Sequence, residues 1–356
     1  MKTKNILCLA LYGDQAASNR VRLGQYQKAL KPYGYELSIN SLLVNDYILA
    51  LTSRAKIPII KLIFSFFRRA KLLLFKNQYD LLIVHCELFP FLPSWVEKLF
   101  LRKPYIYDFD DAFYLKYNKG KYRFLKPFLG SKFKRIIKNA AIVTAGNKNL
   151  LKFAKKYNKN VILLPSVVDT EKYRDLMIAK NNVFTLGWIG SPSTAIYLEQ
   201  IKKPLTSLGK ILPIRFLVIG AEAPAIQNIQ VESIPWSLNE EVSLINQFDV
   251  GLMPLIDDEW SRGKCAYKLI QCMACGVCVI ASPVGSNKDV VKDNCGLLAH
   301  NDEDWYDAIL KLAKNPILRK NLGQASKEHI ALNYSLKVNS LIFVEAIDKA
   351  LDIEKL

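Results

Sequence analysis

The stretch from residue 249 to residue 286 contains two short apolar runs, "DVGLMPLI" (249–256) and "VCVIASPVGS" (277–286), with "CAYKLIQCMACG" (265–276) between them. Short continuous apolar runs are typical of strands that are buried on both faces of a sheet. The segment between them has helical composition, and Gly276 is suited to end a helix. This order predicts two parallel strands joined by a helical crossover.

The same alternation recurs along the chain. Further apolar runs, all expected to be buried strands, are "NILCLALYG" (5–13), "YDLLIVHCE" (79–87), "KPYIYDFDD" (103–111), "AAIVTAGN" (140–147), "NVILLPSVVD" (160–169), "FTLGWIGS" (184–191) and "IRFLVIGA" (214–221). Two successive series of strands and helices in 356 residues predict an α/β protein with two doubly wound, Rossmann-like domains. We expect domains at 1–175 and 176–336, separated near the polar stretch 169–182, with a ligand cleft at the carboxyl ends of the strands.

Charge is distributed unevenly between the two halves. The net charge is +18, but residues 1–180 carry +21 and residues 181–356 carry −3. A basic half predicts an anionic partner, which could be nucleic acid, anionic lipid or a phosphorylated substrate. A general lysine-rich bias is the alternative, although such a bias would not leave the second half acidic.

One basic segment, 54–76, is also rich in large apolar residues. At helical spacing its polar residues gather on one side and its apolar residues on the other; the polar set is Lys61, Ser65, Arg68, Arg69, Lys71 and Lys76. Such a helix suits a membrane interface, and a core helix with a solvated basic face explains the pattern equally well. A second basic and aromatic cluster follows at 121–138, and no apolar run is long enough to span a bilayer.

Three cysteines, Cys272, Cys275 and Cys278, have the spacing of a bacterial iron–sulfur motif, with Ser282 where a fourth cysteine would stand. The predicted helix and strand separate them, so their thiols would not converge on one cluster. We therefore interpret them as small buried residues and expect no metal and no cofactor. Seven cysteines, an odd number, fit a reducing compartment better than a disulfide framework.

Two motifs in the second half point to a phosphate ligand. In "GWIGSPST", Gly187, Gly190 and Ser191 form a glycine turn before a helix, whose N-terminus favours an anion. If the later helix begins near Gly263, Lys264 and Lys268 both project from its first turns. Two cations there suit a diphosphate, and a solvated basic face is the alternative.

These segments resemble a known family. "FDVGLMPLIDDEWSRGKCAYKLIQCMACGVCVIASPVGSN", "GWIGSPST", "WSLNEEVSLINQFDVG" and "NYSLKV" are similar to the donor-binding part of family-four glycosyltransferases of the GT-B fold, of the bacterial surface-polysaccharide type. "AAIVTAGNKNLLKFAKKYNKNVILLPSVVDTEKY" resembles the end of their acceptor domain. The resemblance implies retaining, metal-independent transfer from a nucleotide-diphosphate sugar, and a helix at 337–356 that crosses back to the N-terminal domain.

The resemblance also assigns candidate residues. Gln271 stands where relatives carry the glutamate that holds the ribose, and Gly263 stands where they carry a sugar-binding glutamate. The resemblance further implies a Gly-Arg and Lys-Gly pair that binds phosphate, and this pair is missing after "GWIG". Lys264 and Lys268, with Arg262, would replace it.

In the N-terminal half, Asp110 occupies the position of a histidine in many relatives and is the catalytic candidate. Asp111 is a second candidate or a turn residue. Arg20 would meet acceptor or phosphate unless it is a surface arginine. His85 would face the ligand unless it is a core histidine.

The expected protein is a cytoplasmic glycosyltransferase, peripheral on the inner face of the plasma membrane. It would use a nucleotide sugar and a glycan or polyprenyl-diphosphate-linked acceptor, and it would contact an anionic membrane surface. A non-catalytic sugar- or nucleotide-binding protein of the same fold is the alternative, suggested by the missing glutamates. We expect no nucleic-acid partner, because no nucleic-acid-binding module is recognisable.

Overall fold

A computed structural model describes residues 3–43, 45, 59–75, 78–176 and 182–353. The chain divides into two compact units: unit 1 comprises Met1–Ser166 and Leu336–Leu356, and unit 2 comprises Val167–Ser335. The last segment of the chain thus belongs to the unit formed by the N-terminal half, as expected for a helix that crosses back. The stretch expected to separate the domains includes residues 177–181, which lie outside the described residues.

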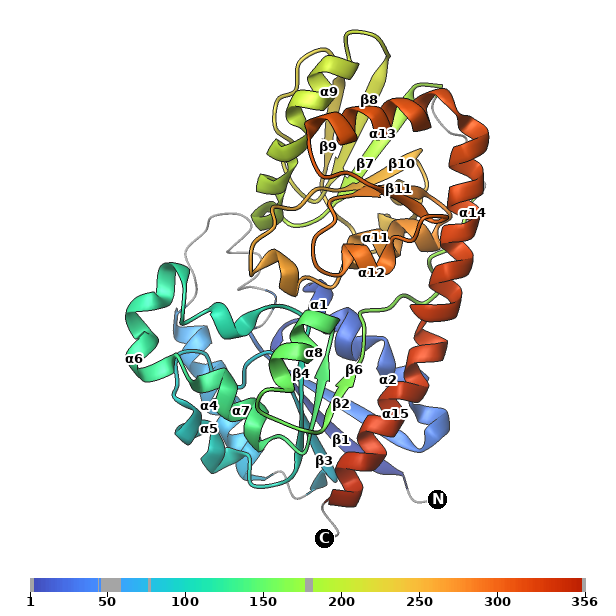
Figure 1. The fold of residues 1–356 in the computed structure, drawn as a ribbon. Coiled ribbons are helices and arrows are strands. Elements are labelled where there is room, and N and C mark those ends of the chain that lie inside the picture. The colour runs from blue at the N-terminus through green and yellow to red at the C-terminus, as the bar shows by residue number, and fades with distance from the viewer. Residues whose placement is uncertain (1–2, 44, 46–58, 76–77, 177–181, 354–356) are drawn as a thin grey trace. The chain divides into compact units, whose positions relative to one another are not determined.

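Unit 1 is built on a six-stranded parallel sheet with the order β2-β1-β3-β4-β5-β6 (Figure 1). Its strands are β1 (Lys4–Tyr12), β2 (Tyr35–Leu43), β3 (Leu81–His85), β4 (Tyr105–Phe109), β5 (Ile142–Ala145) and β6 (Val161–Leu163). Its helical segments are α1 (Ala17–Asn19), η1 (Arg20–Gly24), α2 (Tyr26–Ala29), η2 (Lys31–Tyr33), α4 (Ile59–Leu74), α5 (Ser94–Phe100), η4 (Phe113–Leu115), η5 (Gly120–Leu125), α6 (Lys126–Leu129), α7 (Lys132–Asn139), α8 (Lys148–Ala154) and α15 (Leu336–Ile353). Helices α15 and α2 cover one face of the sheet, and α4, α5 and α7 lie on the other (Figure 1).

Unit 2 contains a second six-stranded parallel sheet, with the order β12-β11-β10-β7-β8-β9. Its strands are β7 (Phe184–Ile189), β8 (Ile214–Ile219), β9 (Gln230–Ile234), β10 (Val250–Met253), β11 (Cys278–Ala281) and β12 (Gly296–Leu298). Its helical segments are η6 (Pro192–Ile201), α9 (Lys202–Leu208), α10 (Glu241–Ile245), η7 (Ser261–Gly263), α11 (Tyr267–Ala274), α12 (Asn287–Val290), α13 (Asp302–Lys314) and α14 (Pro316–Asn333). The predicted doubly wound α/β architecture is confirmed in both units.

Apolar clusters fill both faces of the second sheet. Neighbouring side chains of β7 belong to different clusters: Trp188 lies in the cluster that includes Leu198 and Ile309, whereas Ile189 lies in the cluster that includes Leu269 and residues of α10. This arrangement follows from the period-two alternation of a strand. Buried parallel strands therefore need apolar residues on both sides, which is why they were visible in the sequence as continuous runs.

Helix α4 exposes apolar and basic side chains together and buries part of the side that was predicted to be polar. Ser65, Arg69 and Leu73 face the sheet and are buried, whereas Phe64 and Phe67 are 68% and 69% exposed. Arg69 donates to the carbonyl oxygens of Ala10 (2.6 Å) and Leu88 (3.2 Å), among others, so its charge is held inside unit 1. The predicted solvated basic face is thus wrong for Arg69 and Ser65. The rest of the predicted segment, 54–58 and 76, lies outside the described residues.

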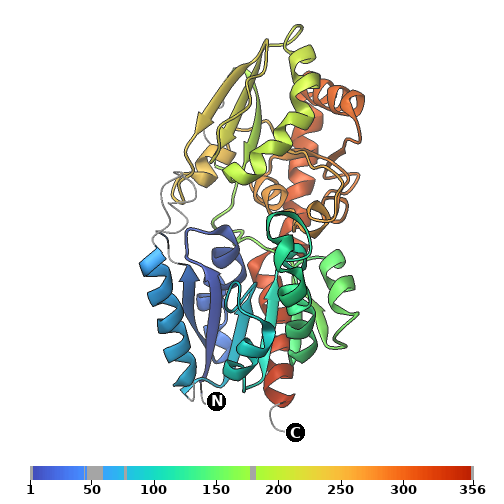
Figure 2. The same cartoon turned by 90° about the vertical axis from the view of Figure 1, so that its left-hand side faces the viewer.

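Helix α4 also lies along the edge of unit 1 in the turned view (Figure 2). Searched over the described residues, the chain has no helix whose length and apolar character would let it cross a membrane.

Candidate functional site

In unit 2, Lys268 lies directly against the glycine turn that follows β7. A Cβ placed on Gly190 would come within 2.4 Å of the Lys268 Cε atom and 2.5 Å of the Trp188 ring, so a larger residue there would displace the lysine side chain or the ring. The Lys268 Nζ atom lies over the Trp188 ring, 4.9 Å from its centroid, and donates to Thr194 Oγ1 at 3.2 Å. Sequence reasoning selected Gly190 and Lys268 separately, and the fold brings them into contact at the carboxyl end of the sheet.

Lys264 approaches the same region from the preceding segment. Its Nζ atom lies 5.8 Å from the centroid of the Tyr197 ring, and the Tyr197 hydroxyl accepts a hydrogen bond from Ser261 (3.1 Å). The prediction that the helix begins near Gly263 is wrong, because α11 begins at Tyr267. Only Lys268 belongs to its first turn, and Lys264 has extended backbone.

The turn into α11 is conformationally unusual. Ala266, the residue before the helix, has φ of 53°, in the left-handed region that non-glycine residues rarely adopt. Such a conformation costs of order 1–3 kcal/mol and persists where the surrounding structure imposes it. It sets the directions in which Lys264 and Lys268 leave the backbone.

The other donor candidates have different surroundings. Arg262 is paired with Asp257 through Nε (2.7 Å) and Nη2 (3.1 Å). The Ser191 hydroxyl lies 3.0 Å from that of Ser193, at the start of the segment that contains Thr194. Gly187 has a packing reason, since a Cβ there would come within 2.1 Å of the Phe248 ring. The predicted contacts of these three residues with a donor stay predictions.

Gln271 is buried inside a polar cluster. Its Nε2 atom donates to the Tyr173 hydroxyl (3.0 Å) and lies 3.5 Å from Glu241 Oε2. Glu241 also accepts from Tyr173 (2.5 Å), Trp236 Nε1 (3.0 Å) and Lys172 (3.0 Å). Glu241 therefore places a carboxylate beside the position where the family resemblance implies a glutamate, and sequence reasoning missed it because it lies 30 residues upstream.

The cysteine motif does not converge. Cys272 lies on α11 and Cys278 on β11, and burial raises the pKa of the Cys275 thiol to about 12. Ser282 Oγ accepts from the amide of Leu255 (2.9 Å). Where the structure describes the chain, no group of ligand atoms that could hold a metal includes these cysteines.

In unit 1, three neighbouring strands bring polar residues into one row. Strand register pairs His85 with Asp108 and Asp108 with Thr144. Asp108 accepts from His85 Nδ1 (2.8 Å), from Thr144 Oγ1 (2.6 Å) and from both Nε (3.1 Å) and Nη2 of Arg22. Burial alone would raise the pKa of Asp108, but Arg22 and the hydrogen bonds hold it well below its usual range.

Arg22, and not Arg20, is the arginine that reaches this row. Arg22 is buried and also donates to the carbonyl oxygen of Leu164 (2.6 Å). Arg20 donates to the carbonyl oxygens of Asp14 (2.9 Å) and Gln15 (2.6 Å) in the loop after β1. The two arginines stand two positions apart in "SNRVRL", and no sequence pattern shows which one turns inward.

The acidic residues after β4 differ in their surroundings. Asp110 is half-buried, and its Oδ1 atom lies 3.8 Å from the Cys86 thiol. Asp111 accepts a hydrogen bond from the amide of Ala112 (2.8 Å), as a turn residue does. His85 is fully buried with both ring nitrogens engaged, as the core-histidine alternative described.

A second buried charge cluster lies beside this row. Lys132 contacts Glu87 (2.7 Å) and Glu97 (3.0 Å), and Glu87 also accepts from Lys116 and Tyr117. Burial raises the pKa of Glu97 to about 7, while Lys132 opposes that shift. Lys132 belongs to the basic and aromatic cluster at 121–138, and because it is buried it does not contribute to a basic surface.

Comparison with known proteins agrees with this architecture. Residues 180–315 match the model of a family described as Glycosyl transferases group 1. No curated protein matches the chain.

Solved structures match over nearly the whole chain. Sucrose-phosphate synthase from Thermosynechococcus elongatus has a TM-score of 0.70 at 13% identity, covering 99% of this chain and 100% of its own. A glycosyltransferase from Rickettsia africae has a TM-score of 0.71 at 14% identity, covering 99% of both chains. HepE from Anabaena, in complex with UDP-glucose, has a TM-score of 0.66 at 12% identity, covering 97% and 99%.

The TM-scores show a common fold, and at identities this low the likeness shows the fold alone. The Gly190–Lys268 contact and the Lys264 side chain both fall inside the segment that matches the family model. The chain therefore has the two-domain GT-B fold, and its residues 180–315 match the model of the family described as Glycosyl transferases group 1.

Proposed function

We propose that this protein is a retaining glycosyltransferase that moves a sugar, of the hexosyl type, from a nucleotide-diphosphate sugar to a glycan acceptor. The observation that carries the proposal is the contact between Lys268 and the Gly190 turn, inside the segment that matches the family model. A glycine turn admits a ligand close to the backbone, and a lysine beside it neutralises phosphate. That HepE was solved with UDP-glucose supports a nucleotide sugar as the donor.

The chemistry assigned to unit 2 is stabilisation of a leaving group. As the glycosidic bond breaks, negative charge develops on the departing nucleoside diphosphate. Lys264 and Lys268, held near aromatic rings in a partly buried site, stabilise that charge without reorganising. In this proposal the two lysine side chains take the place of a metal ion. Arg262 and Ser191 add contacts to the diphosphate at the edge of the site.

The chemistry assigned to unit 1 belongs to Asp110. Its half-buried carboxylate stands at the carboxyl end of β4, beside the Arg22–Asp108–His85 row that fixes the local backbone. It would accept a proton from the acceptor hydroxyl or orient the transferred sugar. The proposal gives supporting roles, and no direct proton transfer, to Asp111, Arg20 and His85.

A lipid-linked acceptor is supported by the exposed face of α4. Its outward side chains are apolar (Ile59, Ile60, Ile63, Phe64, Phe67 and Leu74) and are interspersed with exposed Lys61, Arg68 and Lys71. Neighbouring α5 adds Trp95 and Leu99, and the 120–129 region adds Phe124 and Phe128. Aromatic and apolar side chains mixed with cations are suited to an anionic lipid surface.

This surface fits work at the cytoplasmic face of a bacterial plasma membrane. There the protein would extend a polyprenyl-diphosphate-linked glycan during synthesis of a cell-surface polysaccharide.

The test combines donor binding with turnover. Thermal shifts across uridine, guanosine and other nucleotide sugars should single out one donor class, and that donor should yield product with membrane extract as acceptor. Product with retained anomeric configuration, formed in the presence of a chelator, is expected. A folded protein that none of the donors stabilises and that turns none of them over contradicts the proposal.

A second candidate is a non-catalytic nucleotide-binding protein of the same fold. The observation that favours it is Gln271, whose amide is engaged by Tyr173 and Glu241, together with Gly263 in place of a sugar-binding carboxylate. Donor binding at Lys268 with neither transfer nor donor hydrolysis would identify this case.

A further inference from the structure

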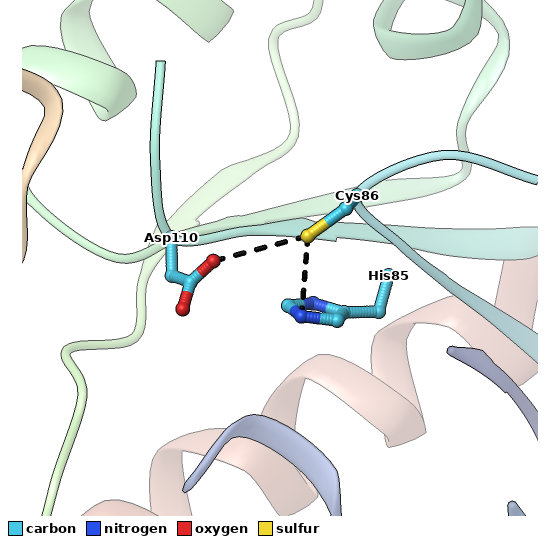
Figure 3. Close-up of side chains that lie close together, drawn as sticks. All are labelled: His85, Cys86 and Asp110. Carbon is cyan, nitrogen blue, oxygen red and sulfur yellow. Dashed lines mark hydrogen bonds between the residues drawn. The ribbon is translucent and has the colours of Figure 1, made fainter. Parts of the chain in front are cut away.

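Three side chains with metal-binding atoms meet at the carboxyl end of β3 and β4 in unit 1. His85, Cys86 and Asp110 converge there (Figure 3), and their ligand atoms all lie within 4.8 Å of one another. The Cys86 Sγ atom is 3.2 Å from His85 Nε2 and 3.8 Å from Asp110 Oδ1. Over the described residues, no other group of three such side chains meets this description.

Two of the three separations fit a cation bound to the Cys86 Sγ atom. With Zn–S of about 2.3 Å and Zn–N or Zn–O of about 2.0–2.2 Å, they subtend angles of about 95° and about 120° at the ion, which bracket the tetrahedral value. The His85 and Asp110 atoms lie within 4.8 Å of each other, and two such bonds span at most about 4.3 Å, so the Asp110 side chain must close any remaining gap. Asp110 is the half-buried member and therefore gives the cluster its access to solvent.

The histidine is oriented as a metal ligand. Its Nδ1 atom faces Asp108 at 2.8 Å, and Arg22 donates to the same carboxylate. The other ring nitrogen, Nε2, lies toward Cys86, 3.2 Å from its Sγ atom. A carboxylate behind the histidine is the usual outer shell of a protein metal site.

The backbone at Cys86 is an independent sign of a built site. Cys86 has φ of 64°, in the left-handed region, although it is neither glycine nor asparagine. This conformation turns its thiol back toward His85 and Asp110 instead of along the strand. Strain of this kind persists where the surroundings impose it, and it clusters at ligand and active sites.

The same geometry could indicate a thiol nucleophile activated by the histidine, but the burial of the thiol opposes that interpretation. Cys86 is fully buried, whereas reactive cysteines are partly exposed to their substrates. A small cation can enter beside the half-buried Asp110.

We propose that His85, Cys86 and Asp110 form a binding site for a thiophilic divalent cation of the Zn²⁺ class. The cation enters as the Cys86 thiol releases its proton, and water completes the coordination. The site does not rest on the proposed function. One consequence does: a cation held by Asp110 takes the carboxylate assigned to transfer, so metal occupancy and transfer exclude each other.

The test is titration of the full-length, chelator-treated protein with Co²⁺, followed by Zn²⁺, under a thiol-free reductant. One equivalent of Co²⁺ should produce a thiolate-to-cobalt absorption band in the near ultraviolet, and Zn²⁺ should remove it. Cys86→Ser should abolish the band. Asp110→Asn should weaken Co²⁺ binding at least tenfold.

The matched control is Cys278→Ser, which alters another buried cysteine, on β11 of unit 2 and hydrogen-bonded to the carbonyl oxygen of Asp249. It should leave the band unchanged. Absence of a thiolate band in the wild-type protein, or a band that survives Cys86→Ser, overturns the proposal. Because the readout needs neither donor nor acceptor, its failure leaves the proposed glycosyl transfer untouched.

Discussion

Substitution of Gln271 by glutamate separates the family resemblance from the structure. The resemblance implies that a glutamate at this position would serve the donor ribose. In the structure, the Gln271 amide nitrogen is 3.5 Å from Glu241 Oε2 and 3.0 Å from the Tyr173 hydroxyl. Gln271→Glu is nearly isosteric, so it would place two carboxylates in contact inside a buried cluster.

The expected cost can be worked out from that distance. Two unit charges 3.5 Å apart repel by about 5 kcal/mol at an effective dielectric constant of about 20. Protonating a glutamate with an ordinary pKa costs about 5 kcal/mol at pH 8 and about 1 kcal/mol at pH 5, so protonation offers no cheaper route at pH 8. Lys172, which pairs with Glu241 at 3.0 Å, offsets part of the repulsion. We expect a destabilisation of about 3–5 kcal/mol at pH 8 that falls to about 1 kcal/mol at pH 5.

Urea unfolding followed by tryptophan fluorescence measures this difference, because Trp236 donates to Glu241 and reports on the cluster. The control is the exchanged pair, Glu241→Gln with Gln271→Glu, which keeps one carboxylate and one amide and should recover most of the lost stability. A Gln271→Glu protein as stable as wild type at pH 8 would refute this account. Tighter nucleotide-sugar binding by that stable variant would favour the ribose role.

Three further changes test the donor site, the exposed face of α4 and the buried charge cluster. Lys268→Ala should weaken binding of the nucleotide-diphosphate sugar roughly tenfold to a hundredfold in calorimetry, since a hydrogen-bonded charge is lost. The control Lys210→Ala, at an exposed lysine, should not weaken it. Equal donor affinities of Lys268→Ala and the wild type would remove Lys268 from the site. Phe67→Glu should reduce binding to anionic vesicles at least about tenfold in sedimentation, because burying a phenylalanine contributes about 1.5–3 kcal/mol. The control is Leu332→Glu, which alters a similarly exposed apolar residue of unit 2. Equal losses of vesicle binding in both variants would argue against a binding surface on α4. Burial raises the pKa of Glu97 to about 7, so its contribution to stability is fully present below its unfolded pKa and is lost as pH rises through about 7. Between pH 4.5 and pH 8 the wild type should therefore lose about 3 kcal/mol relative to Glu97→Gln in urea unfolding; parallel pH profiles for the two proteins would contradict the shift.

The strands buried in the middle of each sheet were predictable from the sequence, and the edge strands were harder. Central strands such as β3, β4, β10 and β11 have neighbours on both sides and helices on both faces, so they read as continuous apolar runs. Three of the four edge strands, β2, β9 and β12, escaped notice. Strand β9 has no fully buried residue, and β2 alternates buried and exposed positions at its start, because an edge strand is partly solvated.

Motif reading singled out Gly190, Lys264 and Lys268, because a glycine turn and paired cations are recognisable from their spacing, and their contact with a donor stays a prediction. It misjudged the start of α11 by four residues, since the left-handed Ala266 that precedes this helix has no sequence signal. For α4, helical periodicity predicted one polar and one apolar side, but Arg69 and Leu73, from opposite predicted sides, are buried together. Periodicity alone does not tell which residues meet the sheet.

The sequence by itself determined the fold class, the number of sheets and the elements that carry the donor motif, because backbone hydrogen bonding and apolar burial act through local patterns. Only the tertiary structure decided that Arg22 and not Arg20 meets Asp108, that Glu241 accompanies Gln271, and that His85, Cys86 and Asp110 converge. These contacts join residues that lie far apart in the chain or on neighbouring strands. Strand register and the direction of individual side chains create them, and neither is written in residue spacing.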